Sequence, residues 1–408
     1  MPINDMIIDQ GFYYEGRGFS QKLPTGIVTL DIALGGGIPL NGSIIEIYGE
    51  ESAGKSTLSY RICKKCTDQP AGYVTWVDSE LSYDPGWAKV QGLNPEKAIA
   101  YRPPYMEKAN DLILSDIHRY KEVYLPWLVD SKWKPSKQDA EDAGLGISNI
   151  DGIKAHMIEV APPHMIVWDS LAAAPVKTQV EEDSEFASGM AYRARLIKSF
   201  LSRYMVAVDG CDKIGMILIN QVIDNIGSYG GGVSTPGGRG LRHGKHLSIF
   251  VKRSGSGERD TENFKVTDYV FLSITKNKVT PVISSFPVIF SKSRGFLGTT
   301  SVLEYLLNIG WFKSAGSWKK FTYEKVDPET GEIFEEEMSI QRGTFYDLIE
   351  KRPEILEYLC EQTKKLFFDK FPFSKTLEET DIKAIIEACM SEESSHLEEE
   401  EISSMSEE

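Results

Sequence analysis

The chain of 408 residues is predicted to be an α/β protein with a mainly parallel, twisted β-sheet flanked by helices. From about Gly42 to Lys278, short apolar and β-branched runs alternate with segments of helical periodicity. Runs such as IIEIY, MIVWD and MILIN are apolar almost throughout, as strands buried on both faces should be. The composition, 41% hydrophobic and 26% charged residues, is that of a globular protein.

Six segments have the length and apolar character of strands in this sheet. They are Ser43 to Tyr48, Tyr73 to Asp78, Met165 to Asp169, Gly215 to Asn220, Leu247 to Lys252 and Tyr269 to Thr275. Residues 118–160 interrupt the alternation with a mixed, loop-rich sequence, which we interpret as an insert. After about Gly298 the pattern becomes helical, which predicts a small C-terminal α/β domain over residues 298–390, following a core over residues 27–297.

The net charge of −15 is unevenly distributed along the chain. Residues 391–408 contain eight glutamates and no lysine, arginine or aspartate, so the rest of the chain carries only −7. Such a Ser/Glu-rich segment is too polar to bury a core, and we expect a disordered acidic tail. The tail is either a solubility device or a nucleic-acid mimic that competes for a basic surface of its own protein.

The location predicted from the sequence is the cytoplasm. The chain has no uncharged apolar run of 18 or more residues, and its N-terminus lacks the order of a signal peptide. Five cysteines are too few and too scattered for a disulfide framework. Cys63 and Cys66 form a C-x-x-C within a predicted helix, without a second Cys/His pair at zinc-ligand spacing. We therefore expect them to pack in the core, and any metal to have oxygen ligands.

A phosphate-binding motif follows the first predicted strand. The octapeptide GEESAGKS fits G-x-x-x-x-G-K-[ST], with a strand before it and a helical pattern after it. In this motif backbone N–H groups surround phosphate oxygens, Lys55 neutralises the β/γ-phosphates and the Ser56 hydroxyl binds Mg²⁺. The predicted nucleotide contacts are Gly49, Glu50, Glu51, Ser52, Ala53, Gly54, Lys55, Ser56 and Thr57.

Two further acidic positions suit phosphoryl transfer. Asp169 ends an apolar strand, where a carboxylate emerges beside the P-loop and can hold Mg²⁺ together with Ser56. Glu80 lies just past another strand end and suits a general base or a group that orients water. Asp78, at the end of that strand, competes with Glu80 for this role, and the residues alone leave both possible.

In their order along the chain, these motifs resemble the RecA strand-exchange recombinases of bacteria and their phage relatives of the UvsX type. The resemblance runs from LPTGIVTLDIALGGGIPLNGSIIEIYGEESAGKST, through VDSELSYDPGWAKVQGLNPEKAI, IVWDSLAAAP, LINQ, TPGGRGL and TKNK, to about Phe290. It covers most of residues 24–295 apart from the insert. It implies a RecA-type P-loop ATPase core that uses ATP and Mg²⁺, forms a helical filament on single-stranded DNA, and catalyses homologous pairing and strand exchange.

The resemblance implies roles for individual residues at the nucleotide. It identifies Glu80, rather than Asp78, as the carboxylate that activates water. Asp84 and Trp87 match the residues that hold adenine, by a polar contact and an aromatic stack. Gln221, at the end of LINQ, matches the γ-phosphate sensor that couples ATP to the DNA-binding loop.

Lys276 and Lys278 alternate, which predicts that both side chains lie on one face of a strand. By themselves they would be solvated surface lysines. By resemblance they reach across a subunit boundary to the neighbour's ATP phosphates, where a cation supports phosphoryl transfer. Phe290 is implied to contact the neighbour's nucleotide as well. The N-terminal segment, residues 1–26, is short for a subunit-docking element.

The DNA-binding positions are also implied by resemblance. Residues 222–240, with seven glycines, match the second DNA-binding loop, and residues 175–189, followed by a basic helix, match the first. Such contacts go to phosphates, so they confer affinity without sequence preference. A solvated helix face is the alternative for the cations of the helix. The residues assigned to DNA are Met190, Arg193, Arg195, Lys198, Arg203, Val222, Ile223, Gly237, Gly238, Arg239, Lys252 and Arg253.

The chain departs from the bacterial pattern at several positions. Leu241 is followed by Arg242 and His243 where the family has an aromatic residue in its subunit relay. Phe271 and Ser273 stand where two basic residues of the secondary DNA site are expected. The C-terminal stretch and the acidic tail look more like the phage UvsX branch, so we expect a viral source.

Two other functions remain open from the sequence. One is a ring-forming helicase or motor with the same core fold, and the other is an ATP-dependent mediator that binds single-stranded DNA. The lysine pair and the glycine-rich loop argue against the first, and Glu80 argues against the second. The expected partners are single- and double-stranded DNA, other copies of the chain, and single-strand-binding or mediator proteins, without a membrane.

Overall fold

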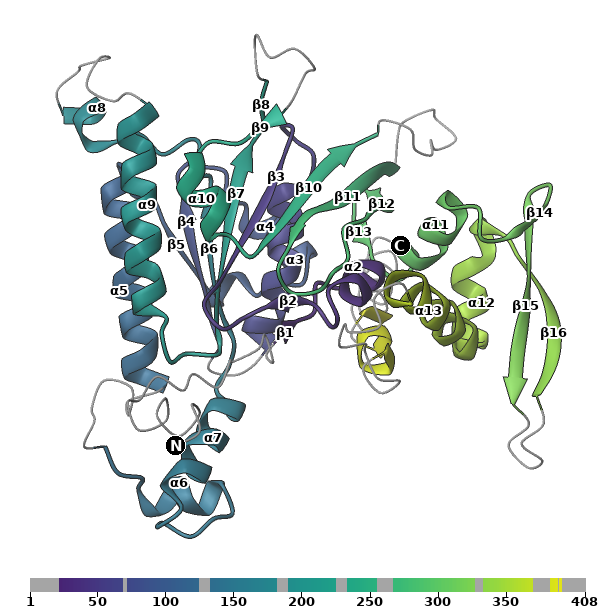
Figure 1. The fold of residues 1–408 in the computed structure, drawn as a ribbon, viewed down its shortest axis with the longest axis horizontal. Coiled ribbons are helices and arrows are strands. Elements are labelled where there is room, and N and C mark those ends of the chain that lie inside the picture. Colours follow the sequence, from purple (N-terminus) through teal and green to yellow (C-terminus); the bar gives the residue numbers. More distant parts are fainter. Residues whose placement is uncertain are drawn as a thin grey trace, which may run out of the picture.

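The computed structural model describes residues 22–68, 72–124, 133–181, 190–224, 233–254, 267–326, 333–369, 382–387 and 389–390. It confirms the predicted α/β class: a nine-stranded sheet carries helices on both faces, and a smaller three-stranded sheet lies toward the C-terminus (Figure 1). The predicted acidic tail, residues 391–408, lies outside the described residues, as does most of the N-terminal segment.

Six parallel strands form the larger part of the sheet, in the spatial order β10-β3-β7-β6-β4-β5. They are β3 (Ser43–Gly49), β4 (Val74–Asp78), β5 (Ala98–Tyr101), β6 (His164–Asp169), β7 (Ile214–Gln221) and β10 (Leu247–Arg253). Five of the six predicted strands are therefore parallel strands. Because parallel strands end at the same edge, residues following β3, β4, β6 and β7 are brought together.

Three antiparallel strands extend the sheet beyond β10. They are β11 (Thr267–Asn277), which was also predicted, β12 (Ser285–Ser291) and β13 (Gly295–Leu297). Two short pairs lie outside the main sheet: β1 (Lys22–Leu23) with β2 (Ile38–Pro39), and β8 (Ile223–Asp224) with β9 (Val233–Ser234).

Helices cover both faces because the strands are apolar on both faces. Ile45 and Ile47 belong to one buried cluster with α2 (Val28–Ala33), α3 (Lys55–Asp68) and α4 (Pro85–Val90). Ile44 belongs to a second cluster with α5 (Met106–Tyr124), α9 (Met190–Ala207) and α10 (Gly238–Gly244). Alternate residues of β3 thus face opposite helical layers. Cys63 and Cys66 are buried in α3, in the first of these clusters.

Between α5 and β6 lie α6 (Lys137–Asp142) and α7 (Ile150–Val160). The predicted insert, residues 118–160, therefore begins inside α5 and includes both of these helices. Since α7 leads into the start of β6, the two helices lie at the amino ends of the parallel strands, away from β8 and β9 (Figure 1). A further helix, α8 (Lys177–Glu181), and 3-10 turns at Pro95–Lys97 and Arg342–Thr344 complete the connections.

The chain after β13 packs beside the antiparallel end of the main sheet (Figure 1). It comprises α11 (Ser301–Asn308), β14 (Lys313–Ala315), β15 (Trp318–Val326), β16 (Ile333–Ile340), α12 (Phe345–Lys351) and α13 (Pro353–Phe368). Its buried side chains belong to the same hydrophobic cluster as α2 and α3. None of the helices in the described ranges combines the length and apolar character that a membrane span needs.

Candidate nucleotide-binding site

The P-loop connects β3 to α3 at the carboxyl edge of the sheet. Ser52 and Gly54 have positive φ angles of 56° and 101°, which turn the backbone around the loop. A side chain at Gly54 would also place its Cβ 3.2 Å from Cζ of Phe296, so the loop has little space behind it. Glu50 and Glu51 are exposed, and Ala53 is buried.

Lys55, the first residue of α3, reaches back across the loop. Its Nζ donates to the carbonyl oxygens of Gly49 at 3.2 Å and Glu50 at 2.6 Å. Burial lowers the pKa of Lys55, although the nearby carboxylates of Glu80 and Asp169 act in the opposite direction. The ammonium therefore lies above the loop, where a phosphate chain can replace its backbone acceptors.

Ser56 and Asp169 meet at the candidate metal position. The Ser56 hydroxyl donates to Oδ2 of Asp169 at 2.7 Å, and the Asp169 side chain is 1% exposed at the end of β6. Burial raises the pKa of Asp169 to about 7, although the hydrogen bond from Ser56 opposes this. A hydroxyl and a carboxylate beside a phosphate-binding loop fit the hard oxygen ligands of Mg²⁺.

Glu80 and Gln221 point toward one another across the strand ends. Gln221 ends β7 opposite Gly49 in the parallel register, and its Nε2 donates to Oε1 of Glu80 at 2.9 Å. The hydroxyl of Ser170 donates to the same oxygen. The two bonds hold the Glu80 carboxylate within reach of the P-loop edge. Ser170 had not been singled out from the sequence, although it directly follows Asp169.

Asp78 has a different environment, although it ends the strand that leads to Glu80. Its side chain is 1% exposed and accepts hydrogen bonds from the backbone N–H groups of Ser82 at 3.0 Å and Tyr83 at 3.2 Å. Nε of Arg102 lies 3.6 Å from its Oδ2. The Asp78 carboxylate therefore anchors the loop that carries Glu80.

Asp84 and Trp87 lie at the start of α4. The Asp84 carboxylate caps this helix by accepting from the N–H groups of Gly86 at 2.9 Å and Trp87 at 3.0 Å. The indole N–H of Trp87 donates to the Thr57 hydroxyl at 2.9 Å, and its ring is half-buried. The two side chains thus have defined local roles beside α3, and their contacts with adenine stay a prediction.

Phe290 packs behind the P-loop of its own chain. Its side chain is 5% exposed, and its ring centroid lies 5.0 Å from that of Phe296. A Cβ added to Gly54 would lie 3.5 Å from Cε2 of Phe290. A side chain that contacts a neighbour's nucleotide is expected to be exposed, whereas Phe290 is buried in its own chain. Its contact with a neighbour's nucleotide stays a prediction.

Lys276 and Lys278 both point toward the end of α10. Their Nζ atoms donate to the carbonyl oxygens of Arg242 at 2.5 Å and His243 at 3.1 Å. Burial lowers the pKa of the nearby His246 to about 4, and the charges of Lys278 and Lys276 add to this effect. Lys276 pairs with Ser248 of β10, and Ser248 pairs with Glu46 of β3. Glu46 precedes Gly49 by three residues, which is about 10 Å along the strand. The lysine pair is therefore displaced from the P-loop of its own chain.

The predicted DNA-binding cations of α9 do not share one face. Arg193 is half-buried, and its guanidinium donates to the carbonyl oxygens of Leu171 at 3.2 Å and Ala172 at 2.8 Å. Arg195 and Lys198 are exposed, and Arg203 is exposed with Nη2 3.8 Å from Oδ1 of Asp111. Arg193 thus ties α9 to the segment after β6, while the other three cations are accessible.

The two basic residues predicted to bind DNA at the end of β10, Lys252 and Arg253, also differ in their environments. Lys252 is exposed, whereas Nε of Arg253 lies 3.5 Å from Oδ2 of Asp268, which is 1% exposed. The guanidinium of Arg253 also lies over the ring of Phe290, 5.4 Å from its centroid. Arg253 is therefore engaged within the chain.

The ends of the predicted second DNA loop are ordered by β8, β9 and α10. Val222 precedes β8, Arg239 is exposed on α10, and the segment 225–232 lies outside the described residues. Gly237 and Gly238 have φ angles of 117° and 65°, and a Cβ at Gly238 would lie 3.3 Å from that of Ala194 on α9. A Cβ at Gly238 would therefore make a tight contact with α9, in addition to the backbone strain that its positive φ would impose. The side chains of Met190 and Ile223 are outside the described part.

Comparison with known proteins identifies the family. A family profile described as the RecA N-terminal domain matches residues 17–130 and 138–294, well over half of the chain. The chain belongs to the RecA family. Only residues 131–137 of the predicted insert fall in the gap between these two matched stretches.

Three curated relatives, each named "Protein RecA", illustrate the distance within the family. The protein of Malacoplasma penetrans is 29% identical over 334 residues, 81% of this chain and 87% of the relative. That of Fusobacterium nucleatum is 28% identical over 75% of this chain and 69% of the relative, and that of Aquifex aeolicus is 28% identical over 74% of each. These bacterial relatives do not test the resemblance to the phage UvsX branch, which stays a prediction.

Proposed function

We propose that the chain is a DNA-dependent ATPase that assembles as a helical filament on single-stranded DNA and promotes homologous pairing and strand exchange. The single observation that carries the ATPase assignment is the convergence of Lys55, Ser56, Asp169, Glu80 and Gln221 at one edge of the sheet. Membership of the RecA family supports the extension to recombination.

In the proposed reaction Lys55 binds the β- and γ-phosphate oxygens, and the backbone N–H groups of the P-loop hold the phosphate chain. Ser56 and Asp169 would hold Mg²⁺, which supplies charge neutralisation at the transferring phosphoryl group. Glu80 orients a water molecule and accepts its proton as the water oxygen bonds to the γ-phosphorus. The bond from that phosphorus to the bridging oxygen breaks, giving ADP and phosphate.

The local contacts favour Glu80 over Asp78 as the base. Asp78 uses its carboxylate on two backbone N–H groups and is almost fully buried. Glu80 instead contacts two side chains, Ser170 and Gln221, which can move with the γ-phosphate. Gln221 is then the residue that reports the presence of this phosphate to the segment after β7.

Lys276 and Lys278 support a site shared between subunits. Their side chains lie away from the P-loop of their own chain, and their charge would suit the phosphates of a neighbour's nucleotide. Nucleotide at the boundary would favour assembly in the ATP-bound state, and hydrolysis would favour release. The accessible cations Arg195, Lys198 and Arg239 would contact DNA phosphates.

The deciding experiment is ATP hydrolysis measured without DNA, with single-stranded DNA and with duplex DNA. We expect stimulation mainly by single strands, and loss of hydrolysis in Glu80→Gln. Glu122→Gln, which changes an exposed carboxylate of α5 paired with His118, is the matched control and should hydrolyse ATP as the wild type does. Hydrolysis that is indifferent to DNA would limit the assignment to an ATPase and contradict the recombinase proposal. A strand-exchange assay follows a positive result.

A further inference from the structure

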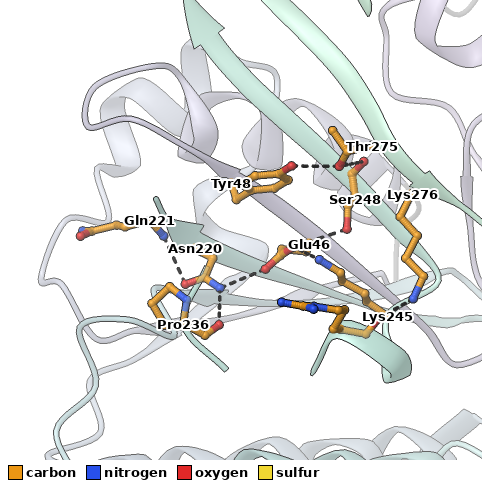
Figure 2. Close-up of polar contacts among 10 residues, drawn as sticks. Glu46, Tyr48, Asn220, Gln221, Pro236, Lys245, Ser248, Thr275 and Lys276 are labelled. Atoms are coloured by element: carbon orange, nitrogen blue, oxygen red, sulfur yellow. Dashed lines mark hydrogen bonds and ion pairs between the residues drawn. The ribbon is translucent and has the colours of Figure 1, made fainter. Parts of the chain in front are cut away.

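A buried carboxylate lies in β3 shortly before the P-loop. The Glu46 side chain is 0% exposed, and its Oε1 accepts from Nδ2 of Asn220 at 3.0 Å (Figure 2). Its Oε2 forms an ion pair with Nζ of Lys245 and accepts from the Ser248 hydroxyl at 3.4 Å. A buried charge of this kind is tolerated only while its partners stay in place. The carboxylate therefore links three separate elements of the fold.

Asn220 joins this carboxylate to the nucleotide edge. Its side chain is 0% exposed and makes three hydrogen bonds (Figure 2). Nδ2 donates to Glu46 and, at 2.9 Å, to the carbonyl oxygen of Pro236, just before α10. Oδ1 accepts from the backbone N–H of Gln221 at 3.2 Å. A shift of the Gln221 backbone would therefore strain the bonds of Asn220 to Glu46 and Pro236.

Lys245 carries the connection to the lysine pair. It directly follows α10, and its side chain is only 12% exposed. The last turn of α10 supplies the carbonyl oxygens that accept from Lys276 and Lys278. A displacement of α10 would therefore move both lysines.

A second connection runs through β3 itself. The hydroxyl of Tyr48, next to Gly49, donates to Oγ1 of Thr275 at 3.0 Å (Figure 2). Thr275 directly precedes Lys276 in β11 and opposes no residue of β10, because the register shifts between Ser248 and Ile249. The hydrogen bond thus joins β3 to β11 at the position where the pairing of β11 with β10 is irregular.

We propose that Asn220, Glu46 and Lys245 are positioning residues that couple Gln221 to α10 and to the Lys276 and Lys278 side chains. The inference rests on the proposed function insofar as it takes Gln221 as the group that contacts the γ-phosphate. Binding at that phosphate shifts Gln221, and the buried polar chain transmits the shift because its bonds cannot be replaced by water.

The test is amide hydrogen exchange in α10, residues 238–244, with and without a non-hydrolysable ATP analogue and Mg²⁺, in dilute protein without DNA. In the wild type we expect the analogue to slow exchange in α10. In Asn220→Leu and in Glu46→Gln, which preserves the shape of the side chain, we expect this effect to fall by on the order of 5-fold. Analogue affinity, measured separately, should stay within about 3-fold in Glu46→Gln, since Glu46 does not line the P-loop.

A matched control separates coupling from stability. Glu304 is 2% exposed and accepts two hydrogen bonds from Arg342, at 2.7 and 2.9 Å, far from the nucleotide edge. Glu304→Gln should lower stability while leaving the response of α10 to the analogue unchanged. A wild-type response in Glu46→Gln and Asn220→Leu would overturn the inference, as would a wild-type α10 that ignores the analogue.

The outcomes also separate the inference from the proposed function. If α10 responds to the analogue but hydrolysis is indifferent to DNA, the coupling stands and the recombinase proposal fails. If hydrolysis depends on DNA but α10 does not respond, the proposed function stands and the coupling fails. Failure of the wild type to bind the analogue would overturn both.

Discussion

The Ser56 hydroxyl donates a hydrogen bond of 2.7 Å to Oδ2 of Asp169, which joins the first turn of α3 to the end of β6. The two residues are 113 positions apart in the chain. The bond brings together a hydroxyl and a carboxylate beside the P-loop, and it holds the carboxylate in a place from which solvent is almost excluded. Three predictions follow from this site and its surroundings, and a fourth concerns the acidic C-terminal residues.

The first concerns the pH dependence of stability. Because burial raises the pKa of Asp169 from 3.8 to about 7, the folded chain binds a proton that the unfolded chain has released. Between the unfolded pKa of 3.8 and the folded pKa of about 7, the contribution of Asp169 to the free energy of unfolding should therefore fall as pH rises. The slope should reach up to about 1.4 kcal/mol per pH unit. Asp169→Asn should remove this slope. Urea unfolding without divalent cations, between about pH 5 and 7, measures the difference from wild type.

Asp142→Asn is the control for that measurement. The Asp142 side chain is exposed on α6, so this substitution removes no buried carboxyl group. The difference between Asp142→Asn and wild type should thus be constant over the same range. An equal slope for wild type and Asp169→Asn would refute the assignment.

The second prediction separates Glu80 from Asp78. Glu80→Gln should lower the maximal rate of hydrolysis by on the order of 100-fold or more while ATP binding persists, because it removes the proton acceptor. Asp78→Asn should mainly lower stability, by about 1–3 kcal/mol, because it weakens the bonds that anchor the loop. Steady-state kinetics and unfolding of each variant provide the comparison. The reverse pattern would make Asp78 the base.

The third prediction tests whether Lys276 and Lys278 act on a neighbouring chain. Lys55→Ala and the double variant Lys276→Ala/Lys278→Ala should each be inactive alone. In an equal mixture on single-stranded DNA, about one boundary in four should combine an intact P-loop with an intact lysine pair, if assembly is random. The mixture should then regain about a quarter of the wild-type rate. A mixture as inactive as its components would indicate that the lysines serve their own chain.

The fourth prediction concerns the acidic C-terminal residues. Removal of residues 391–408 should tighten binding to duplex DNA several-fold at moderate salt, because eight negative charges are lost. Replacement of the eight glutamates by glutamine in the full chain should have the same effect if charge is the cause. Fluorescence anisotropy with a labelled duplex at several salt concentrations measures both. Unchanged affinity would leave the tail a solubility device.

The sequence predicted the sheet and the P-loop well because both depend on local patterns. Strands such as β3 and β7 are buried on both faces, so their apolar runs are continuous and easily recognised. The spacing of Gly49, Gly54 and Lys55 is a local requirement of the phosphate-binding loop. The placement of Asp169 followed from parallel topology, since strands ending at one edge bring their last residues together.

The sequence did not reveal which of the candidate DNA-binding cations form contacts within the chain. Arg193 and Arg253 stand in basic segments and looked like their neighbours Arg195 and Lys252. Their partners, the carbonyl oxygens after β6 and the buried Asp268, come from other elements of the fold. A charge pattern along one helix or strand does not reveal which cations the rest of the chain engages.

The buried connection through Glu46 was not predicted, although a single glutamate in the apolar run IIEIY was a signal that could have found it. Its partners Asn220 and Lys245 are 174 and 199 positions away. By itself the sequence determined the α/β class, the P-loop and the strand-end acids, because each depends on burial or spacing within one segment. Only the tertiary structure decided which cations stay accessible and which polar groups form the path from Gln221 to Lys276, because a buried charge is defined by the partners that the fold brings to it.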